Sequence, residues 1–237
     1  MLVLVTNDKK YNMKILAIET ATEACSAAIS INDTCIYRYE IAPRKHSELI
    51  LPMIDSLLNE ANIKINSFDG IAFGRGPGAF TGVRIAISVA QGLACPHDIP
   101  LIPISTLAAL AQQYSKENNY IATAIDARMN EIYWGLYKKS NKNIMKAIIK
   151  EKVCLPQDIT SPSKNNWLGV GSGWQNYSEE IKSKFTSNII GIKNDTYPDA
   201  KSILELAKID YQESKFISPE KASPVYLRDN VATKKRG

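Results

Sequence analysis

The chain of 237 residues carries a formal net charge of +5, with 45% hydrophobic and 22% charged residues. This length can bury a proper hydrophobic core as one large domain or two small ones, and the mild positive charge tolerates an acidic partner such as RNA without requiring one. No apolar run approaches the roughly 20 residues of a membrane span. The sequence has two histidines and no CxxC spacing, so a zinc site of the usual type is hard to build. The four cysteines are expected to be reduced thiols in a cytoplasmic protein.

Residues 1–12 precede a second methionine, Met13, and are expected to form an N-terminal extension or a loose arm. Met13 is expected to be the natural start; the alternative is a start at Met1, with residues 2–5 pairing as an edge strand. A buried strand is predicted at 13–20, followed by strands at 25–31 and 34–40 whose spacing suits antiparallel hairpins. Three opening strands followed by alternating helices and strands predict a mixed α/β fold.

The first clear helix is predicted at 46–61, where apolar residues recur at a spacing of three and four. Ser47 is its expected N-cap, which places Pro52 inside the helix. A helix at 81–94 is apolar on nearly every side and must be buried or meet a second surface. The remaining predicted elements are strands at 70–73, 99–104, 120–125, 132–137, 147–152 and 167–170, and helices at 106–114, 176–185 and 200–211.

A glycine-rich turn, GRGPGAFTGVR at 74–84, connects the strand at 70–73 to the apolar helix. It is not a P-loop, because no Gly-Lys-Ser/Thr follows, and it lacks the last glycine of the GxGxxG fingerprint. Backbone amides at such a helix start can face an anion. The favoured interpretation is instead that the glycines serve close packing. Gly76 and Gly78 are kept as candidate ligand-facing residues.

Asp126 and Arg128 follow a predicted strand, where α/β proteins often present ligand-contacting side chains, so both are further candidate ligand-facing residues. A surface ion pair within a turn is the equally weighted alternative. His46 could act as a base, but no serine or cysteine partner can be assigned to it, and a histidine at a helix end favours a surface role. Catalytic residues are therefore not predicted.

Five motifs occur together in an order that closely resembles the bacterial TsaB (YeaZ) family: ILAIETAT at 15–22, HSE at 46–48, the glycine turn at 74–84, DAR at 126–128 and YLR at 226–228. The resemblance implies a fold of the actin, sugar-kinase and heat-shock-ATPase type with two lobes, each a mixed β-sheet with helices. The expected lobes are 13–117, with the tail at 212–237 packing back on it, and a smaller lobe at 118–211.

The resemblance also implies a function. Proteins of this family are scaffold and activating subunits that pair with a homologous catalytic subunit, TsaD, and a small ATPase, TsaE. Together these proteins transfer a threonylcarbamoyl group to the adenosine next to the anticodon in tRNAs that read codons beginning with A. The chain is thus expected to meet tRNA through the complex, without a membrane, and to carry no cofactor of its own, with ATP or ADP as a candidate ligand at the complex interface.

Two further expectations follow from the resemblance. The catalytic relative carries an HxxxH metal pair, and the matching positions here are Thr106 and Leu110, so no metal and no transferase chemistry are expected. Family dimers pack helices of the first lobe against each other, which predicts a partner interface on the helices at 46–61 and 81–94 and, in isolation, a homodimer through the same surface. The predicted interface residues are His46, Leu49, Met53, Leu57, Phe80, Arg84 and Ser88.

Other functions stay open at this point. The chain could be an enzyme in its own right, either a glycoprotease-like peptidase or a sugar-kinase-like phosphotransferase, although the missing HxxxH pair argues against the first and the lack of two phosphate loops against the second. It could also bind tRNA directly, through lysines near 138–146 or the Lys-Lys-Arg run at 234–236.

Overall fold

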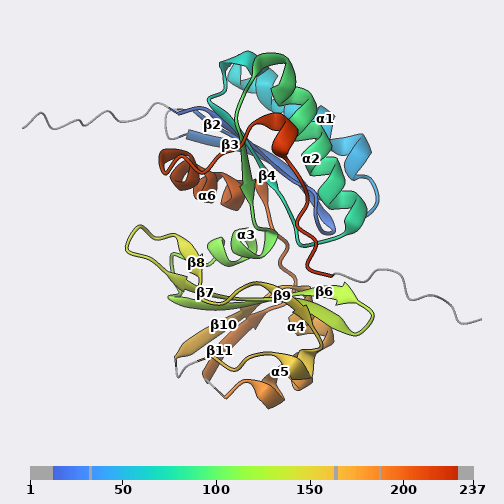
Figure 1. Cartoon of the computed structure of the whole chain (residues 1–237), viewed down its shortest axis with the longest axis vertical. Coiled ribbons are helices and arrows are strands. Elements are labelled where there is room, and N and C mark those ends of the chain that lie inside the picture. The colour runs from blue at the N-terminus through green and yellow to red at the C-terminus, as the bar shows by residue number, and fades with distance from the viewer. Residues whose placement is uncertain (1–12, 32–33, 163–164, 187, 229–237) are drawn as a thin grey trace, which may run out of the picture.

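The computed structural model describes residues 13–31, 34–162, 165–186 and 188–228. The chain forms two lobes stacked along the long axis, each built on a β-sheet of mixed strand direction (Figure 1). This is the two-lobed α/β architecture predicted from the sequence. The predicted extension at 1–12 and the Lys-Lys-Arg run at 234–236 lie outside the described residues.

The first lobe contains a five-stranded sheet in the order β3-β2-β1-β4-β5. The three opening strands form the predicted antiparallel meander, and β4 and β5 run parallel to β1. All residues of β1 and β4 are buried, because helices cover both faces of the sheet there. The strands are β1 (Ile15–Glu19), β2 (Ala24–Ile31), β3 (Thr34–Ile41), β4 (Gly70–Gly74) and β5 (Leu101–Ile104).

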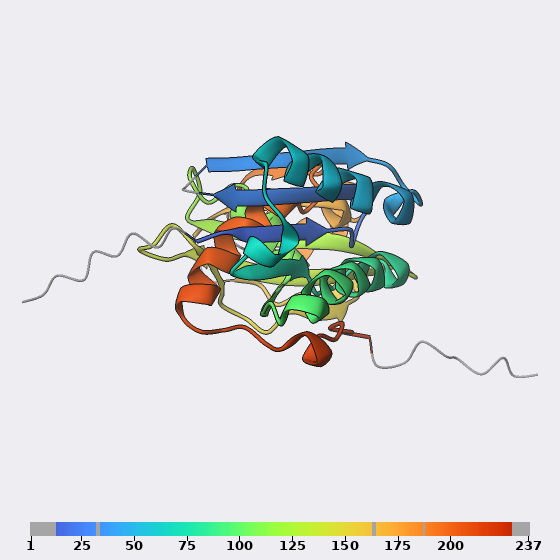
Figure 2. The same ribbon diagram turned by 90° about the horizontal axis from the view of Figure 1, so that it is seen from above.

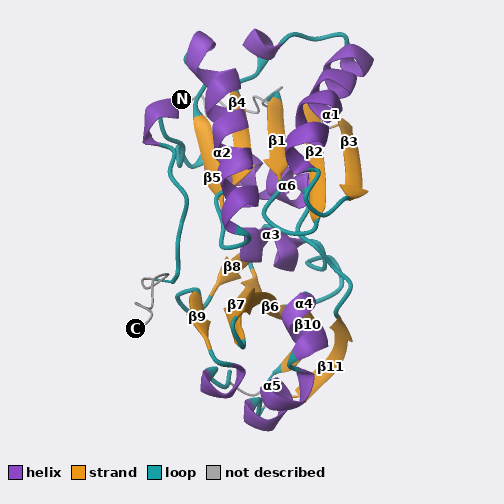
Figure 3. Cartoon of the chain, turned by 90° about the vertical axis from the view of Figure 1, so that its right-hand side faces the viewer, coloured by secondary structure: helices purple, strands orange, loops and turns teal. Residues whose placement is uncertain are grey.

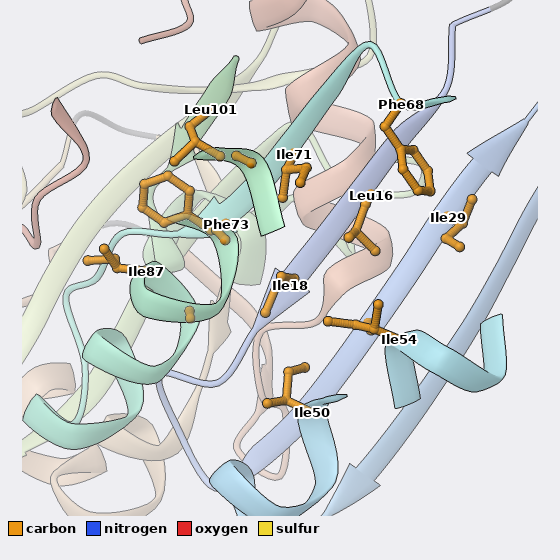
Figure 4. Packing of buried hydrophobic residues seen from close by; sticks show 14 of the residues in the cluster. Leu16, Ile18, Ile29, Ile50, Ile54, Phe68, Ile71, Phe73, Ile87 and Leu101 are labelled. Atoms are coloured by element: carbon orange, nitrogen blue, oxygen red, sulfur yellow. The ribbon is translucent and has the colours of Figure 1, made fainter. Parts of the chain in front are cut away.

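Helices α1 (His46–Ala61) and α2 (Phe80–Ala94) lie side by side on one face of this sheet (Figure 3). Their apolar stripes meet the sheet in a core that includes Ile50, Ile54 and Ile87, which point toward β-strand residues such as Phe73 (Figure 4). Helix α1 contains Pro52, as predicted, but its N-cap residue is Lys45 without a side-chain hydrogen bond. The predicted N-cap Ser47 was wrong because Ser47 is already inside the helix.

The opposite face is covered by α3 (Thr106–Gln112) and α6 (Ala200–Gln212). Helix α3 begins at the predicted cap, where the Ser105 hydroxyl accepts a hydrogen bond from the amide of Ala108. Helix α6 was predicted inside the second lobe, at 118–211. The structure corrects this, because its buried residues Ile203, Leu204 and Ala207 pack against the first sheet.

The second lobe contains a sheet in the order β11-β10-β6-β7-β8, with β9 also pairing with β7. The single strand predicted at 147–152 is wrong, since two short strands at 145–147 and 152–154 pair with β7 and the residues between them belong to no strand. The helix predicted at 176–185 begins earlier and is interrupted at Tyr177, whose backbone is not helical. The elements are β6 (Tyr120–Arg128), β7 (Glu131–Lys139), β8 (Met145–Ala147), β9 (Lys152–Cys154), β10 (Asn166–Val170), α4 (Ser172–Asn176), α5 (Ser178–Lys184) and β11 (Asn188–Lys193).

After α6 the chain runs back along the first lobe as an irregular segment, residues 215–228, which contains a short 3₁₀ helix at Pro219–Lys221. We call this segment the strap. Ile217 exchanges backbone hydrogen bonds with Leu101 at the free edge of β5. The side-chain amide of Gln91 in α2 then donates a hydrogen bond to the carbonyl of Pro219. Seen from above, the strap lies at the side of the molecule opposite β3 (Figure 2). Within the described residues, no helix is long and apolar enough to cross a membrane.

Candidate functional site

A cleft of about 600 Å³ opens where the two lobes meet, and all five sequence motifs contribute to its walls. The β1–β2 turn, the start of α1 and the start of α2 form the side of the first lobe. The β6–β7 hairpin forms the side of the second lobe, and the end of the strap closes the rim. The motifs that carry the family resemblance are thus far apart in the sequence but together in space.

The floor of the cleft forms where the glycine turn packs on the β1–β2 turn. The Thr20 hydroxyl donates a 2.7 Å hydrogen bond to the carbonyl of Gly82, and the amide of Ala79 donates one of 2.7 Å to the carbonyl of Ala21. A Cβ atom at Gly82 would lie 2.1 Å from the Thr20 carbonyl oxygen, and one at Gly78 would lie 2.4 Å from that of Ala21. These glycines therefore serve the close packing favoured from the sequence.

Gly78 lines the cleft, but Gly76 does not. Gly76 is buried with a φ of +94°, and a Cβ atom there would lie 3.1 Å from the carbonyl oxygen of Val225. The prediction that Gly76 faces a ligand was wrong, because the strap covers this side of the turn. Val225 itself donates a 2.9 Å backbone hydrogen bond to the neighbouring carbonyl of Arg75.

Two buried polar side chains in the first-lobe wall have unpaired atoms. His46, the first residue of α1, lines the cleft and is only 8% exposed, so it was wrongly predicted as a surface residue. Its Nε2 atom and the hydroxyl of Thr22 have no hydrogen-bond partner among the described residues. Because an unpaired buried polar atom is costly, this wall is suited to a ligand or partner group that forms hydrogen bonds.

The opposite wall carries Asp126 and Arg128, and both line the cleft. They also bond to each other, since the Asp126 carboxylate accepts hydrogen bonds from the backbone amide and the guanidinium of Arg128 at 2.8 and 3.2 Å. Arg128 also reaches across to Glu23 in the first lobe, at 3.8 Å. The predicted ion pair is therefore present, and both residues line the cleft, so their contact with a ligand stays a prediction.

The tip of this hairpin has an unusual backbone. Arg128, Met129 and Asn130 are consecutive non-glycine residues with φ values of 63°, 56° and 60°. Each such residue carries a steric cost of about 1–2 kcal/mol, which surrounding contacts must offset. The hairpin tip leaves Met129 73% exposed beside the cleft.

The strap supplies the contacts that hold this hairpin. The guanidinium of Arg228 donates hydrogen bonds to the carbonyl of Ala127, at 3.1 Å, and to the carboxylate of Glu131. Tyr226 stacks on Phe80, and its hydroxyl accepts a 2.9 Å hydrogen bond from Arg84. Tyr226 and Arg228 belong to the YLR motif at 226–228 but were not among the predicted site residues. Only the resemblance indicated them, because their partners are distant in sequence.

A second hollow, a groove of about 400 Å³, lies between α1 and α2 on the outer face of the first lobe. Phe80, Arg84 and Ser88, all predicted at the partner interface, line it. Leu51, which was not predicted, lines it too and is 52% exposed. Phe80 is similarly exposed, at 54%.

Three other predicted interface residues, Leu49, Met53 and Leu57, do not line the groove. Leu49 and Met53 are half-buried and pack against the core of the first lobe. Leu57 is fully buried in that core. Its assignment to an outer face was wrong, because the apolar stripe to which it belongs faces the sheet of its own lobe.

Glu19, at the end of β1 beneath the cleft, is the most perturbed carboxyl group of the site. It is fully buried, and one of its oxygens accepts a 2.6 Å hydrogen bond from the amide of Ala21. Burial raises the pKa of Glu19 to about 7, and this hydrogen bond opposes the shift. Thr106 and Leu110, which stand at the metal positions of the catalytic relative, are also fully buried.

Comparison with known proteins finds similarity over nearly the whole chain. A family model described as TsaD, tRNA N6-adenosine threonylcarbamoyltransferase, matches residues 38–236. The tRNA threonylcarbamoyladenosine biosynthesis protein TsaB of Haemophilus influenzae is 40% identical, with 94% of this chain and 97% of that protein covered. TsaB of Escherichia coli is 39% identical, with 94% and 98% covered. A solved structure of YeaZ from Pseudomonas aeruginosa superposes with a TM-score of 0.85 at 39% identity, covering 91% of this chain and all of that one.

Proposed function

The chain belongs to the TsaB (YeaZ) family of tRNA threonylcarbamoyladenosine biosynthesis proteins, and we propose that it serves this pathway as a non-catalytic subunit that binds a TsaD-type catalytic partner through the α1–α2 groove. The TsaE ATPase and tRNA join through that complex in the cytoplasm, with ATP or ADP at the interface. In the absence of the partner, the same groove supports a homodimer.

The groove is the observation that carries this proposal. Leu51 and Phe80 expose about half of their surfaces on neighbouring helices, around a hollow lined also by Ile85 and Val89. Exposed aromatic and aliphatic side chains around a concave surface are typical of the central part of a protein interface. Arg84 and Ser88 at its rim provide the polar contacts that such interfaces need.

The residues at the metal positions support a non-catalytic role. Thr106 and Leu110 cannot replace two imidazole ligands, and both side chains are buried in the packing of α3. Within residues 13–31, 34–162, 165–186 and 188–228, no group of three or more histidine, cysteine or acidic side chains is placed to hold a metal ion.

The alternative of a stand-alone peptidase finds less support in the states of Cys25 and His46. Burial raises the pKa of Cys25 to about 12, so this thiol is not available as a thiolate nucleophile near neutral pH. The Nε2 atom of His46 has no hydroxyl or thiol partner among the described residues, so no paired nucleophile and base are formed there.

A binding measurement tests the proposal. We expect Ser88→Glu, which places a charge at the groove rim, to weaken binding of a purified TsaD-type subunit by roughly tenfold or more, as measured by calorimetry. Gln157→Glu adds the same charge at an exposed position of the second lobe and is expected to change nothing. Equal binding by wild type and Ser88→Glu would overturn the assignment of the groove.

A further inference from the structure

The hairpin formed by β7 and β8 in the second lobe carries a concentrated positive charge. Residues 132–150 contain five lysines and no acidic residue. Four of these lysines are exposed, and only Lys139 is half-buried. The hairpin projects from one side of the molecule, whereas α1 and α2 lie on the other side (Figures 1 and 2). The charge is therefore presented to solvent away from the α1–α2 groove.

Two of the lysines face each other across the strands. Lys138 of β7 lies directly opposite Lys146 of β8 in the antiparallel register. Side chains in this arrangement share one face of the sheet, with Cβ atoms about 4.5–5.5 Å apart, and two like charges so placed oppose the pairing of the strands. A polyanion that contacts both ammonium groups would remove this repulsion.

The rest of the chain does not neutralise the hairpin. Four of its five lysines form no ion pair within the part of the chain that the structure describes: Lys138, Lys139, Lys146 and Lys150. The fifth, Lys142, lies 3.4 Å from the carboxylate of Glu213. Asp210 and Glu213 are the acidic residues near Lys146, and both form ion pairs with Lys215. An excess of positive charge therefore remains on the hairpin.

Contacts at the base of the hairpin hold one of these lysines in place. The ammonium group of Lys138 lies 5.7 Å from the ring centroid of Tyr120, and this ring packs against buried Trp167, with centroids 5.2 Å apart. A cation over an aromatic ring is weakly attracted to it. Because Lys138 is already ordered, it loses less side-chain entropy when it binds an anion.

The exposed residues between the lysines indicate the kind of partner. From residue 138 to residue 147, the exposed side chains belong to lysines, asparagines and one alanine. This part of the surface has no exposed aromatic or large aliphatic side chain of the kind that forms the centre of a protein interface. Closely spaced lysines among small and polar residues instead suit a chain of phosphates.

We propose that the lysines of the β7–β8 hairpin bind the phosphate backbone of an RNA. The inference rests on the proposed function, which places this chain in a complex that acts on tRNA, and it adds a direct contact made by this chain's own second lobe. Lysine binds phosphate as a point charge. Such contacts supply affinity and position the RNA, but they do not read its sequence.

The RNA surface and the partner surface are separate. No residue of the hairpin lines the α1–α2 groove or the cleft between the lobes. A TsaD-type subunit in the groove therefore leaves the hairpin accessible. In the complex, this chain can hold the body of a tRNA while the catalytic partner acts on the adenosine.

Fluorescence anisotropy of a labelled tRNA, titrated with the full-length chain, tests the proposal. We expect binding that weakens steeply between about 50 and 200 mM salt, and a loss of roughly tenfold or more in the double variant K138E/K146E. Lys138→Ala alone should reduce the slope of log K against log salt by about 0.7–0.9, because one phosphate contact is lost. The matched control K182E/K184E makes the same charge change on α5 and should bind as wild type.

The single variant Lys138→Glu separates RNA binding from folding. It replaces the like-charge pair with an ion pair to Lys146, so its melting temperature should equal or exceed that of the wild type. Its affinity for tRNA should nevertheless fall. Lysines that are only solvated would instead leave tRNA binding unchanged in this variant, which would overturn the proposal.

Three further outcomes separate this proposal from its alternatives. No salt-dependent binding by the wild type would overturn it, as would binding that is lost only when the Lys-Lys-Arg run at 234–236 is replaced. Calorimetry should show that K138E/K146E binds a TsaD-type subunit with wild-type affinity. A loss of that affinity would show that the hairpin is a protein interface and would also overturn the RNA assignment. Failure of Ser88→Glu to weaken partner binding would overturn the groove assignment alone.

Discussion

The ring of Tyr226 stacks on the ring of Phe80, with centroids 5.6 Å apart and planes 22° from parallel. Phe80 lines both the cleft and the α1–α2 groove, and Tyr226 belongs to the strap that reaches the second lobe. One aromatic pair therefore lies between the proposed partner surface and the contact that joins the lobes.

Removing this pair should loosen the strap. We expect Tyr226→Ala to lower the free energy of unfolding by about 1–2 kcal/mol, because both the stacking and the hydrogen bond from Arg84 are lost. Tyr226→Phe keeps the ring and should cost about half as much. Urea unfolding measures both, and equal costs for the two variants would show that stacking contributes nothing.

The close approach at Gly82 gives a second prediction. An alanine inside a helix normally stabilises it by about 0.5–1 kcal/mol relative to glycine. Gly82→Ala should instead destabilise the protein by about 2 kcal/mol or more, since the new Cβ would lie 2.1 Å from the Thr20 carbonyl oxygen. At Gly92, in the same helix, a Cβ atom would meet no neighbouring group within 4 Å, so Gly92→Ala should show the normal gain. Thermal unfolding of both variants distinguishes steric contact from helix propensity.

Leu57 and Leu51 should have opposite phenotypes. Leu57→Ala is expected to lower the free energy of unfolding by about 2–5 kcal/mol, because it opens a cavity in the core. Leu51 is 52% exposed in the groove, so Leu51→Ala should leave stability within about 0.5 kcal/mol. Binding of a TsaD-type subunit should be weakened by Leu51→Ala. If Leu51→Ala binds as wild type, this part of the groove is not in the interface.

Glu19 predicts a pH dependence of stability. Its pKa in the folded protein is raised from 4.5 to about 7, so the folded state binds the proton more tightly than the unfolded state does. The resulting stabilisation is present below pH 4.5 and is lost as the pH rises toward 7, by about 3 kcal/mol at 1.36 kcal/mol per pKa unit. Glu19→Gln should flatten the dependence of the unfolding free energy between pH 5 and 8. An unchanged slope in this variant would assign the dependence to other groups.

Features of the fold that depend on residues close together in the sequence were predicted correctly. The opening meander, the cap at Ser105 and the packing role of the glycine turn depend on neighbouring residues, and the structure has all three. The periodicity of α1 identified its apolar residues but could not tell that Leu57 faces its own sheet while Leu51 faces outward. That distinction depends on how the helix is rotated against the strands.

Long-range contacts account for the other corrections. Helix α6 follows the second lobe in sequence but packs on the first sheet, because its apolar stripe fits the face left open by α1 and α2. Gly76 is covered by Val225, and the cleft rim is completed by Tyr226 and Arg228. No local signal pairs these residues, and only the family resemblance singled out Tyr226 and Arg228.

We propose that this chain is a required subunit without transferase activity of its own. Reconstitution of threonylcarbamoyl transfer to tRNA, from a purified TsaD-type subunit, the ATPase and the activated donor, is the decisive experiment. We expect transfer only when this chain is added, reduced transfer with Ser88→Glu, and none from this chain with the donor and tRNA alone. Full transfer without this chain, or transfer by this chain alone, would contradict it.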